Sequence, residues 1–164
     1  MAFGAAGSLG YAVVVRFAAL IFAAILLAGC GPAPAPPKAK VDPTQEPWYG
    51  ESTQRLAAMA SQAAQLLHAG QRDQAAAIVS QGQPLSDRLL SAPRPTLEAM
   101  EAVSDLDQLY AEMLAGNSYW GSARMIFQKN ITRWKNWKPA TPDTERRLKQ
   151  AQTGIAECDK HMGG

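Results

Sequence analysis

The sequence contains few of the residues from which metal sites and redox sites are built. Its 164 residues include two Cys and two His, which leaves little material for a structural metal site. A strong charge imbalance is also missing, because 16 Lys and Arg stand against 14 Asp and Glu, a formal net charge of +2. A nucleic-acid binder normally has a concentrated basic excess, so the composition argues against that class. The length is that of one domain at most.

Charge is nearly absent close to the N-terminus, where residues 9–29 carry Arg16 alone. An apolar segment of this length could cross a membrane as a helix. The segment ends in Leu27-Ala28-Gly29-Cys30, which resembles the lipobox, the cleavage site of bacterial lipoproteins. Arg16 then supplies the positive region of a signal peptide, and residues 17–27 supply its apolar region. An uncleaved membrane helix with an incidental cysteine is the alternative.

The lipobox resemblance implies a membrane anchor. Residues 1–29 would be the signal peptide, and Cys30 would become the first mature residue and carry acyl chains such as palmitate. Several acyl chains give stable anchoring, whereas a single chain is marginal. Gly31 stands where lipoproteins of the inner membrane often have Asp, so the resemblance favours the outer membrane, facing the periplasm, over the inner membrane. Apart from this covalent lipid we expect no cofactor.

Proline is concentrated directly after this cysteine. Pro32-Ala33-Pro34-Ala35-Pro36-Pro37 predicts an extended polyproline II segment, because proline fixes φ and removes a hydrogen-bond donor. Residues 38–47 show no apolar periodicity. We therefore expect residues 30–47 to form a tether and residues 48–164 to form the folded domain.

The folded part lacks the alternation of apolar and polar residues that predicts strands, and it is rich in residues that favour helices. Apolar residues recur at three- and four-residue steps, which predicts amphipathic helices. The expected helices span 47–69, 72–90 with a kink or break at Gly82 and Pro84, 96–115, 118–137 and 141–162. Short connections make successive helices antiparallel. We therefore expect an all-α fold of about five helices packed as antiparallel α-hairpins.

One predicted turn carries a second resemblance. Gly70-Gln71-Arg72-Asp73-Gln74-Ala75 resembles the turn between the two helices of a tetratricopeptide repeat, with Leu66 and Val79 at positions that take large apolar residues there. Arg72 and Gln62 depart from that pattern, and the sequence shows no regular 34-residue period. The resemblance implies tetratricopeptide-like packing, and a small helical bundle is the alternative.

Two neighbouring predicted helices carry charges of opposite sign. All ionic residues from 95 to 115 are acidic, and all those from 118 to 138 are basic. The acidic set is Glu98, Glu101, Asp105, Asp107 and Glu112, and the basic set is Arg124, Lys129, Arg133, Lys135 and Lys138. In one interpretation the two helices pair along their charged edges, where exposed ion pairs contribute ~0.2–1 kcal/mol each.

In the other interpretation the basic helix binds phosphate groups or anionic glycans, because Trp and cationic side chains suit a membrane interface. Trp120 and Trp134 fall on the apolar stripe of this helix and are expected in the core, whereas Tyr119 and Trp137 flank the stripe. The candidate binding surface is Tyr119, Arg124, Lys129, Arg133, Lys135, Trp137 and Lys138. The two interpretations are compatible.

Catalytic motifs are scarce. Gly116-Asn117-Ser118-Tyr119 resembles part of a nucleophile elbow, but Trp120 replaces its final glycine and no strand precedes it. His68, at the end of the first predicted helix, suits an interaction with the helix dipole. We expect no catalytic residue and no metal site. Cys158 lies on an apolar stripe and is expected to be buried, with an intermolecular disulfide as the alternative.

These patterns predict a non-enzymatic lipoprotein. We expect it to bind an envelope protein or to help assemble an envelope complex, with the membrane as a second partner through the lipid. The alternative is a binder of anionic envelope polymers or lipid head groups through residues 118–138. Neither nucleic acid nor a small-molecule substrate is expected as a partner.

Overall fold

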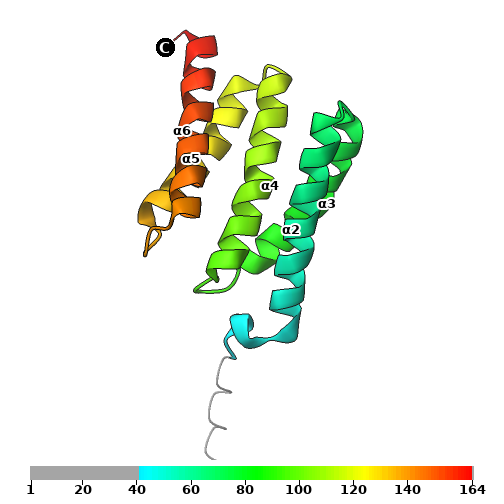
Figure 1. The fold of residues 1–164 in the computed structure, drawn as a ribbon, viewed down its shortest axis with the longest axis vertical. Helices are drawn as coiled ribbons and strands as arrows, with labels where there is room; N and C mark the ends of the chain where they lie inside the picture. The colour runs from blue at the N-terminus through cyan, green and yellow to red at the C-terminus, as the bar shows by residue number, and fades with distance from the viewer. Residues whose placement is uncertain (1–40, 164) are drawn as a thin grey trace, which may run out of the picture. The chain divides into compact units, whose positions relative to one another are not determined.

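The computed structural model describes residues 41–163, and these residues form an all-α fold (Figure 1). A 3-10 turn, η1 (Pro43–Gln45), precedes five α-helices in this part of the chain. The helices are α2 (Pro47–His68), α3 (Arg72–Leu90), α4 (Leu97–Gly116), α5 (Trp120–Asn136) and α6 (Pro142–Met162). No strand occurs between residues 41 and 163. The predicted fold class is therefore confirmed.

The predicted signal peptide, the lipobox with Cys30 and the Pro-rich segment lie outside the described residues. Among the residues that are described, no helix combines the length and the apolar character that a membrane crossing requires.

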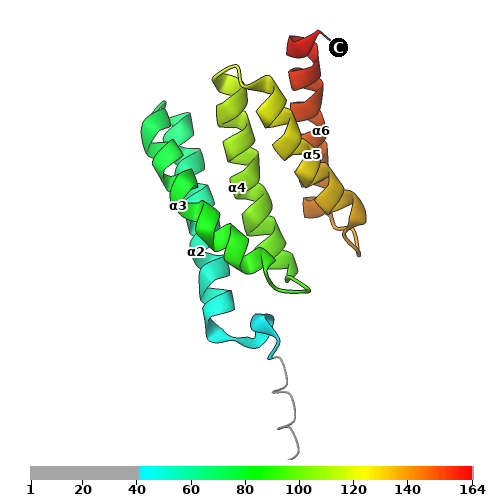
Figure 2. The ribbon, with the colours of Figure 1, turned by 180° about the vertical axis from the view of Figure 1, so that it is seen from behind.

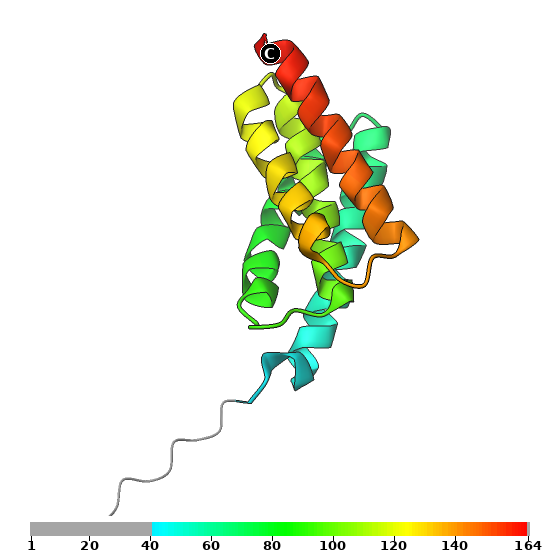
Figure 3. The same ribbon diagram turned by 90° about the vertical axis from the view of Figure 1, so that its left-hand side faces the viewer.

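The helices are arranged in two layers. Helices α2, α4 and α6 form one layer (Figure 1), and α3 and α5 lie behind them, as the view from the opposite side shows (Figure 2). The side view separates the two layers, with α4 between α2 and α6 (Figure 3). Within the first layer α4 contacts both α2 and α6, and each helix also packs on its neighbour in sequence. Helix α4 is therefore the central element of the fold.

Local sequence signals explain several helix ends. The Thr96 side chain accepts a hydrogen bond from the backbone N–H of Ala99 at the start of α4, and Thr141 caps α6 with Pro142 in its first turn. Gly70 follows α2 with φ of +75°, the left-handed conformation that glycine adopts without strain. The sequence predicts the glycine in the turn after α2 and the start of α6 at residue 141, whereas Thr96 was placed inside the helix that it caps.

Other helix ends differ from the prediction. Residues 43–45 form η1, with Asp42 accepting from the N–H of Thr44, so this part of the predicted tether is helical and not extended. Ser118 adopts φ of +65° and belongs to a turn, so α5 begins at Trp120 without a side-chain cap. The start predicted for this helix, residue 118, is therefore two residues too early.

Helix α3 continues through Gly82 and Pro84, so the break that was one of the two expected outcomes does not occur. The reason for the glycine is packing. An ideal Cβ at Gly82 would lie 2.7 Å from Leu106 Cδ2 and 3.2 Å from Leu56 Cδ1, so a side chain here would displace the buried Leu106 side chain. Glycine at position 82 therefore allows close helix packing. Pro84 has no backbone N–H to donate within the helix, and α3 nevertheless continues through it.

The buried apolar residues form two clusters. The first joins α2, α3 and α4, with Tyr49, Leu56, Val79, Leu89, Val103 and Leu106 as its large members. The second joins α4, α5 and α6 and has Ala111, Ala123, Phe127 and Cys158 as its fully buried members. Cys158 is buried as predicted, and burial raises the pKa of its thiol. Trp134 is also buried, as expected.

Candidate functional site

The residues of the predicted basic surface are separated in the structure. Arg133 requires a correction, because its side chain is buried between α4 and α5 and cannot be part of a binding surface. Its Nη2 donates to Asp107 Oδ2 at 3.0 Å, and each of the two side chains is 5% exposed. A lone charge in the protein interior is strongly disfavoured, so Asp107 explains why Arg133 can be buried.

Two more of the basic residues already have acidic neighbours. Lys129 Nζ lies 3.3 Å from Asp107 Oδ2, and Arg124 pairs with Asp159 of α6. Lys135 and Lys138 are exposed and make no ion pair with any residue between 41 and 163. Of the five basic residues in the predicted surface, Lys135 and Lys138 are the two whose charge is not paired within residues 41–163.

The aromatic members of the predicted surface lie at opposite ends of α5. Tyr119 directly precedes α5 and is exposed, and Trp137 directly follows it. The 17 residues of α5 correspond to about 26 Å at 1.5 Å per residue. Trp137 also packs edge-on against the buried Trp134, with ring centroids 6.3 Å apart. The predicted residues therefore do not form one continuous patch.

The acidic face of α4 is shared between α5 and α6. Arg147 of α6 donates from Nε to Asp105 Oδ1 at 2.8 Å and from Nη1 to Glu101 Oε1 at 3.1 Å. Burial by itself would lower the pKa of Arg147, but the hydrogen bond and the charge of Asp105, with the charge of Glu101, outweigh that effect and raise the pKa. Asp107 pairs with the basic helix α5, as predicted. Glu101 and Asp105 pair instead with Arg147 of α6.

Uncharged polar groups complete this contact between α4 and α5. Trp134 Nε1 donates to Ser104 Oγ at 2.8 Å, and Asn130 Nδ2 donates to the Ser104 carbonyl oxygen at 3.1 Å. The Asn130 side-chain oxygen accepts from Arg133. Because each of these buried groups has a partner, the network fixes the register of α5 on α4 without a large desolvation cost.

A hollow of about 630 Å³ lies between α4 and α6. We call it the α4–α6 hollow, and its lining is Gln108, Glu112, Ala115, Gly116, Trp120, Phe127, Arg146, Lys149, Gln150, Thr153, Gly154 and Glu157. Its volume lies within the range of about 300–1,000 Å³ that is typical of ligand pockets. Two aromatic residues of α5 contribute to the lining, and the other residues come from α4 and α6.

The aromatic side of the α4–α6 hollow is held rigidly. An ideal Cβ at Gly154 would lie 2.6 Å from three ring atoms of Phe127, so the phenyl ring packs directly against the α6 backbone. The Trp120 ring stacks on His161 with centroids 3.9 Å apart and an interplanar angle of 3°. His161 Nε2 lies 2.9 Å from Glu157 Oε1. An apolar ligand group in this hollow would meet a preformed surface.

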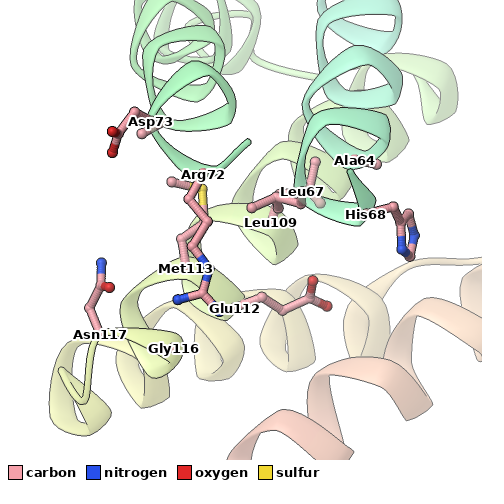
Figure 4. A pocket seen from close by; sticks show the side chains of 11 residues that line it. Ala64, Leu67, His68, Arg72, Asp73, Leu109, Glu112, Met113, Gly116 and Asn117 are labelled. Atoms are coloured by element: carbon pink, nitrogen blue, oxygen red, sulfur yellow. The ribbon is translucent and has the colours of Figure 1, made fainter. Parts of the chain in front are cut away.

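A second hollow of about 410 Å³ lies on the other side of α4. We call it the α2–α4 hollow, and its lining is Ala64, Leu67, His68, Arg72, Asp73, Ala76, Leu109, Glu112, Met113, Gly116 and Asn117. Figure 4 shows the Arg72 side chain extending from α3 toward the last turns of α4, where Glu112 and Gly116 lie. The predicted role of His68 at the end of α2 agrees with its place in the last turn of that helix.

Besides Asp73 of α3, three charged residues along the two hollows make no ion pair within the described part of the chain. They are Arg72 of α3, Glu112 of α4 and Lys149 of α6. The Glu112 carboxylate accepts one hydrogen bond, from the amide of Gln108 at 2.8 Å. These three side chains are free to bind a charged ligand.

Groups that could hold a metal ion do not occur between residues 41 and 163. Within the same range, the buried thiol of Cys158 and the stacked ring of His161 are engaged in packing contacts. The arrangement of the two hollows is suited to binding.

Comparison with known proteins finds no match among protein-family models, curated proteins or solved structures. The resemblances of Leu27-Ala28-Gly29-Cys30 to a lipobox and of residues 70–75 to a tetratricopeptide turn therefore stay predictions.

Sequence reasoning missed both hollows and Arg147. One signal for the α4–α6 hollow was present, because Gly154 lies three residues after Ala151 and four residues before Cys158, on the buried face of its helix. A glycine at such a position indicates close approach of another group. No comparable signal identifies Arg72, Glu112 or Lys149, since their importance depends on the packing of three helices.

Proposed function

We propose that this protein is a lipid-anchored periplasmic lipoprotein that acts without catalysis, as a protein-binding or envelope-assembly accessory. The lipid would be attached to Cys30 and would hold the protein at the outer membrane. The helical body would bind a peptide segment of an envelope protein in the α4–α6 hollow.

The α4–α6 hollow is the observation that supports this proposal. It combines the rigid rings of Trp120 and Phe127 with charged side chains from α4 and α6 at its edges. Apolar anchors surrounded by polar groups are typical of sites that bind a protein partner.

Site-specific photocrosslinking in native envelopes tests the binding site. A photoreactive amino acid replaces Thr153, which is exposed and lines the hollow. Thr132 of α5 is a matched control, because it is also exposed, lines neither hollow and makes the same hydroxyl bond to the carbonyl four residues earlier. We expect a defined protein adduct at position 153 and none at position 132. Identical products at both positions, or lipid adducts alone, would contradict the proposal.

Metabolic labelling tests the anchor. Cells expressing the full chain are grown with radiolabelled palmitate, and the protein is isolated and analysed for the label. We expect incorporation into the unaltered protein and none into a Cys30→Ser variant, while a Cys158→Ser variant keeps the label. Equal labelling of all three proteins would show that Cys30 is not the acceptor.

Binding of anionic polymers or lipid head groups is the weaker candidate function. The exposed Lys135 and Lys138, next to Trp137, favour it. Against it, Arg124, Lys129 and Arg133 are paired with acids, and the first turn of α6 carries Asp143 and Glu145. Salt-sensitive sedimentation with phosphatidylglycerol vesicles, abolished by Lys135→Glu with Lys138→Glu, would support it.

A further inference from the structure

The two hollows meet at one point on α4. Glu112 and Gly116 line both of them, and α4 lies between α2 and α6 in the same layer. Gly116 has no side chain, and an ideal Cβ there would have only Arg72 Nη1 near it, at 4.0 Å. No side chain of α4 therefore protrudes at Gly116, the position where a ligand would pass from one hollow to the other.

Arg72, Glu112 and Lys149 alternate in sign along this path. The carboxylate of Asp73, the fourth unpaired charge of the two hollows in the described chain, points away from Glu112 (Figure 4). Arg72 lines only the α2–α4 hollow, Glu112 lines both hollows, and Lys149 lines only the α4–α6 hollow. The order from α3 across α4 to α6 is therefore positive, negative, positive. A ligand with the complementary order has a basic group between two acidic groups. Such complementarity provides specificity and orientation.

The α4–α6 hollow adds an apolar requirement at one end of the path. Its Phe127 and Trp120 rings can receive a large apolar side chain close to Lys149. The smaller α2–α4 hollow combines aliphatic and charged residues and has no aromatic residue besides His68 in its lining. The two ends therefore differ in chemistry, which would fix the direction of a bound chain.

We infer that the two hollows form one binding site for an extended peptide that crosses α4 at Gly116, with a large apolar side chain beside Phe127 and Trp120 and a basic residue at Glu112. Acidic groups of the peptide meet Lys149 on one side and Arg72 on the other. This inference rests on the proposed function, and it adds the path of the ligand and its charge pattern.

Selection from a displayed library of random 12-residue peptides on the full-length chain in detergent micelles provides the probe. Enriched peptides are synthesised with a fluorescent label, and their dissociation constants are measured by fluorescence anisotropy. We expect the enriched peptides to share an aromatic or large aliphatic residue and one Lys or Arg between acidic residues.

Two glycine variants test the crossing point. Gly116→Trp adds a large side chain at this crossing point and should weaken binding at least tenfold. Gly50→Trp is the matched control, because Gly50 is also exposed and helical, has no neighbouring atom within 4 Å of an ideal Cβ and lines neither hollow. It should change the affinity less than twofold. Far-UV circular dichroism establishes that both variants keep the helical fold.

A charge reversal tests the central contact. Glu112→Lys should weaken binding of the selected peptide at least tenfold, and replacing the peptide's basic residue by Glu should restore most of the lost affinity. Restoration requires direct contact between the two groups, which a general loss of folding would not produce.

The remaining outcomes separate the inference from the proposed function. If selected peptides bind and compete with the Thr153 crosslink but are insensitive to Gly116→Trp and Glu112→Lys, the crossing is wrong and the proposed function stands. If no peptide is enriched, or if the chain binds only phosphatidylglycerol vesicles, both are overturned.

Discussion

The two halves of the helical body are stabilised in different ways. Around α2 and α3 the contact with α4 is made mainly by large apolar side chains, including Leu56, Val79 and Leu106. Around α5 and α6 the apolar cluster has few large members, and charged or polar groups of α4 hold both helices. Asp107 binds Arg133 of α5, while Glu101 and Asp105 bind Arg147 of α6.

This difference indicates which property each half specifies. Apolar contacts are not directional, so the first half depends on volume and shape. Buried ion pairs contribute little net stability compared with apolar contacts, but they penalise every alternative in which a charge is left alone. The second half therefore has a defined register of α5 and α6 on α4, and this register places Phe127 and Gly154 at the α4–α6 hollow.

The largest effect is expected from breaking the buried pair in the second half. Asp107→Leu leaves Arg133 buried without its carboxylate and should lower the free energy of unfolding by about 3–5 kcal/mol. Urea unfolding monitored by far-UV circular dichroism measures this. Asp107→Leu combined with Arg133→Met should recover most of the loss, because no lone charge remains. Lys129→Ala, at the exposed partner of Asp107, should cost less than about 1 kcal/mol.

Removing apolar volume tests the first half. Leu56 is fully buried, so Leu56→Ala should lower the free energy of unfolding by about 2–5 kcal/mol through lost burial and a residual cavity. Because no charge is involved, the loss measured by urea unfolding should be the same at low and high salt. A loss below about 1 kcal/mol would show that this half does not depend on its apolar packing.

A smaller effect is expected at the contact between Gly154 and Phe127. Gly154→Ala places a methyl group where the Phe127 ring lies, and we expect a cost of about 1–3 kcal/mol from overpacking. A second substitution, Phe127→Leu, should relieve part of this cost. Gly50→Ala is the control, since its open helical position should give a gain of up to about 1 kcal/mol in thermal unfolding. Equal effects at the two glycines would contradict the close packing of α5 on α6.

The smallest effect concerns alkaline pH in the first half. Burial raises the pKa of Tyr49 above its ordinary value of 10.0. The unfolded chain therefore ionises first, and stability that is present below pH 10 is lost as the pH rises through the folded-state pKa. Tyr49→Phe removes this dependence, although it also removes the oxygen that accepts from the Thr96 N–H. The slope of unfolding free energy between pH 9 and 11 is the measurement, and equal slopes would refute the prediction.

Much of the fold follows from local sequence signals. The capping residues Thr96 and Thr141 and the glycine at 70 mark helix ends, and the apolar periodicity identifies every helix of the described residues within about two residues. The exceptions are positions where tertiary contacts override local preference. Gly82 and Pro84 stay within α3 because the helix packs closely on α4 at that point.

The candidate site was far less predictable. The sequence shows an acidic segment beside a basic one, but it does not show that α4 lies between two helices and divides its acids between them. The basic surface was predicted as one patch because residues 119–138 are continuous in sequence. In the fold, burial of Arg133 and the length of α5 separate its members. Each of the two hollows is instead lined by residues from three different helices, and such a combination has no local pattern.

Helix α2 also determines how far a bound partner is held from the preceding chain. The helix begins beside η1, where the described chain starts, and its last turn lines the α2–α4 hollow with Leu67 and His68. Its 22 residues span about 33 Å at 1.5 Å per residue. The α2–α4 hollow therefore lies about one helix length from the start of the described chain. A partner bound there is separated from the preceding residues by a folded helix, so this separation does not depend on the conformation of those residues.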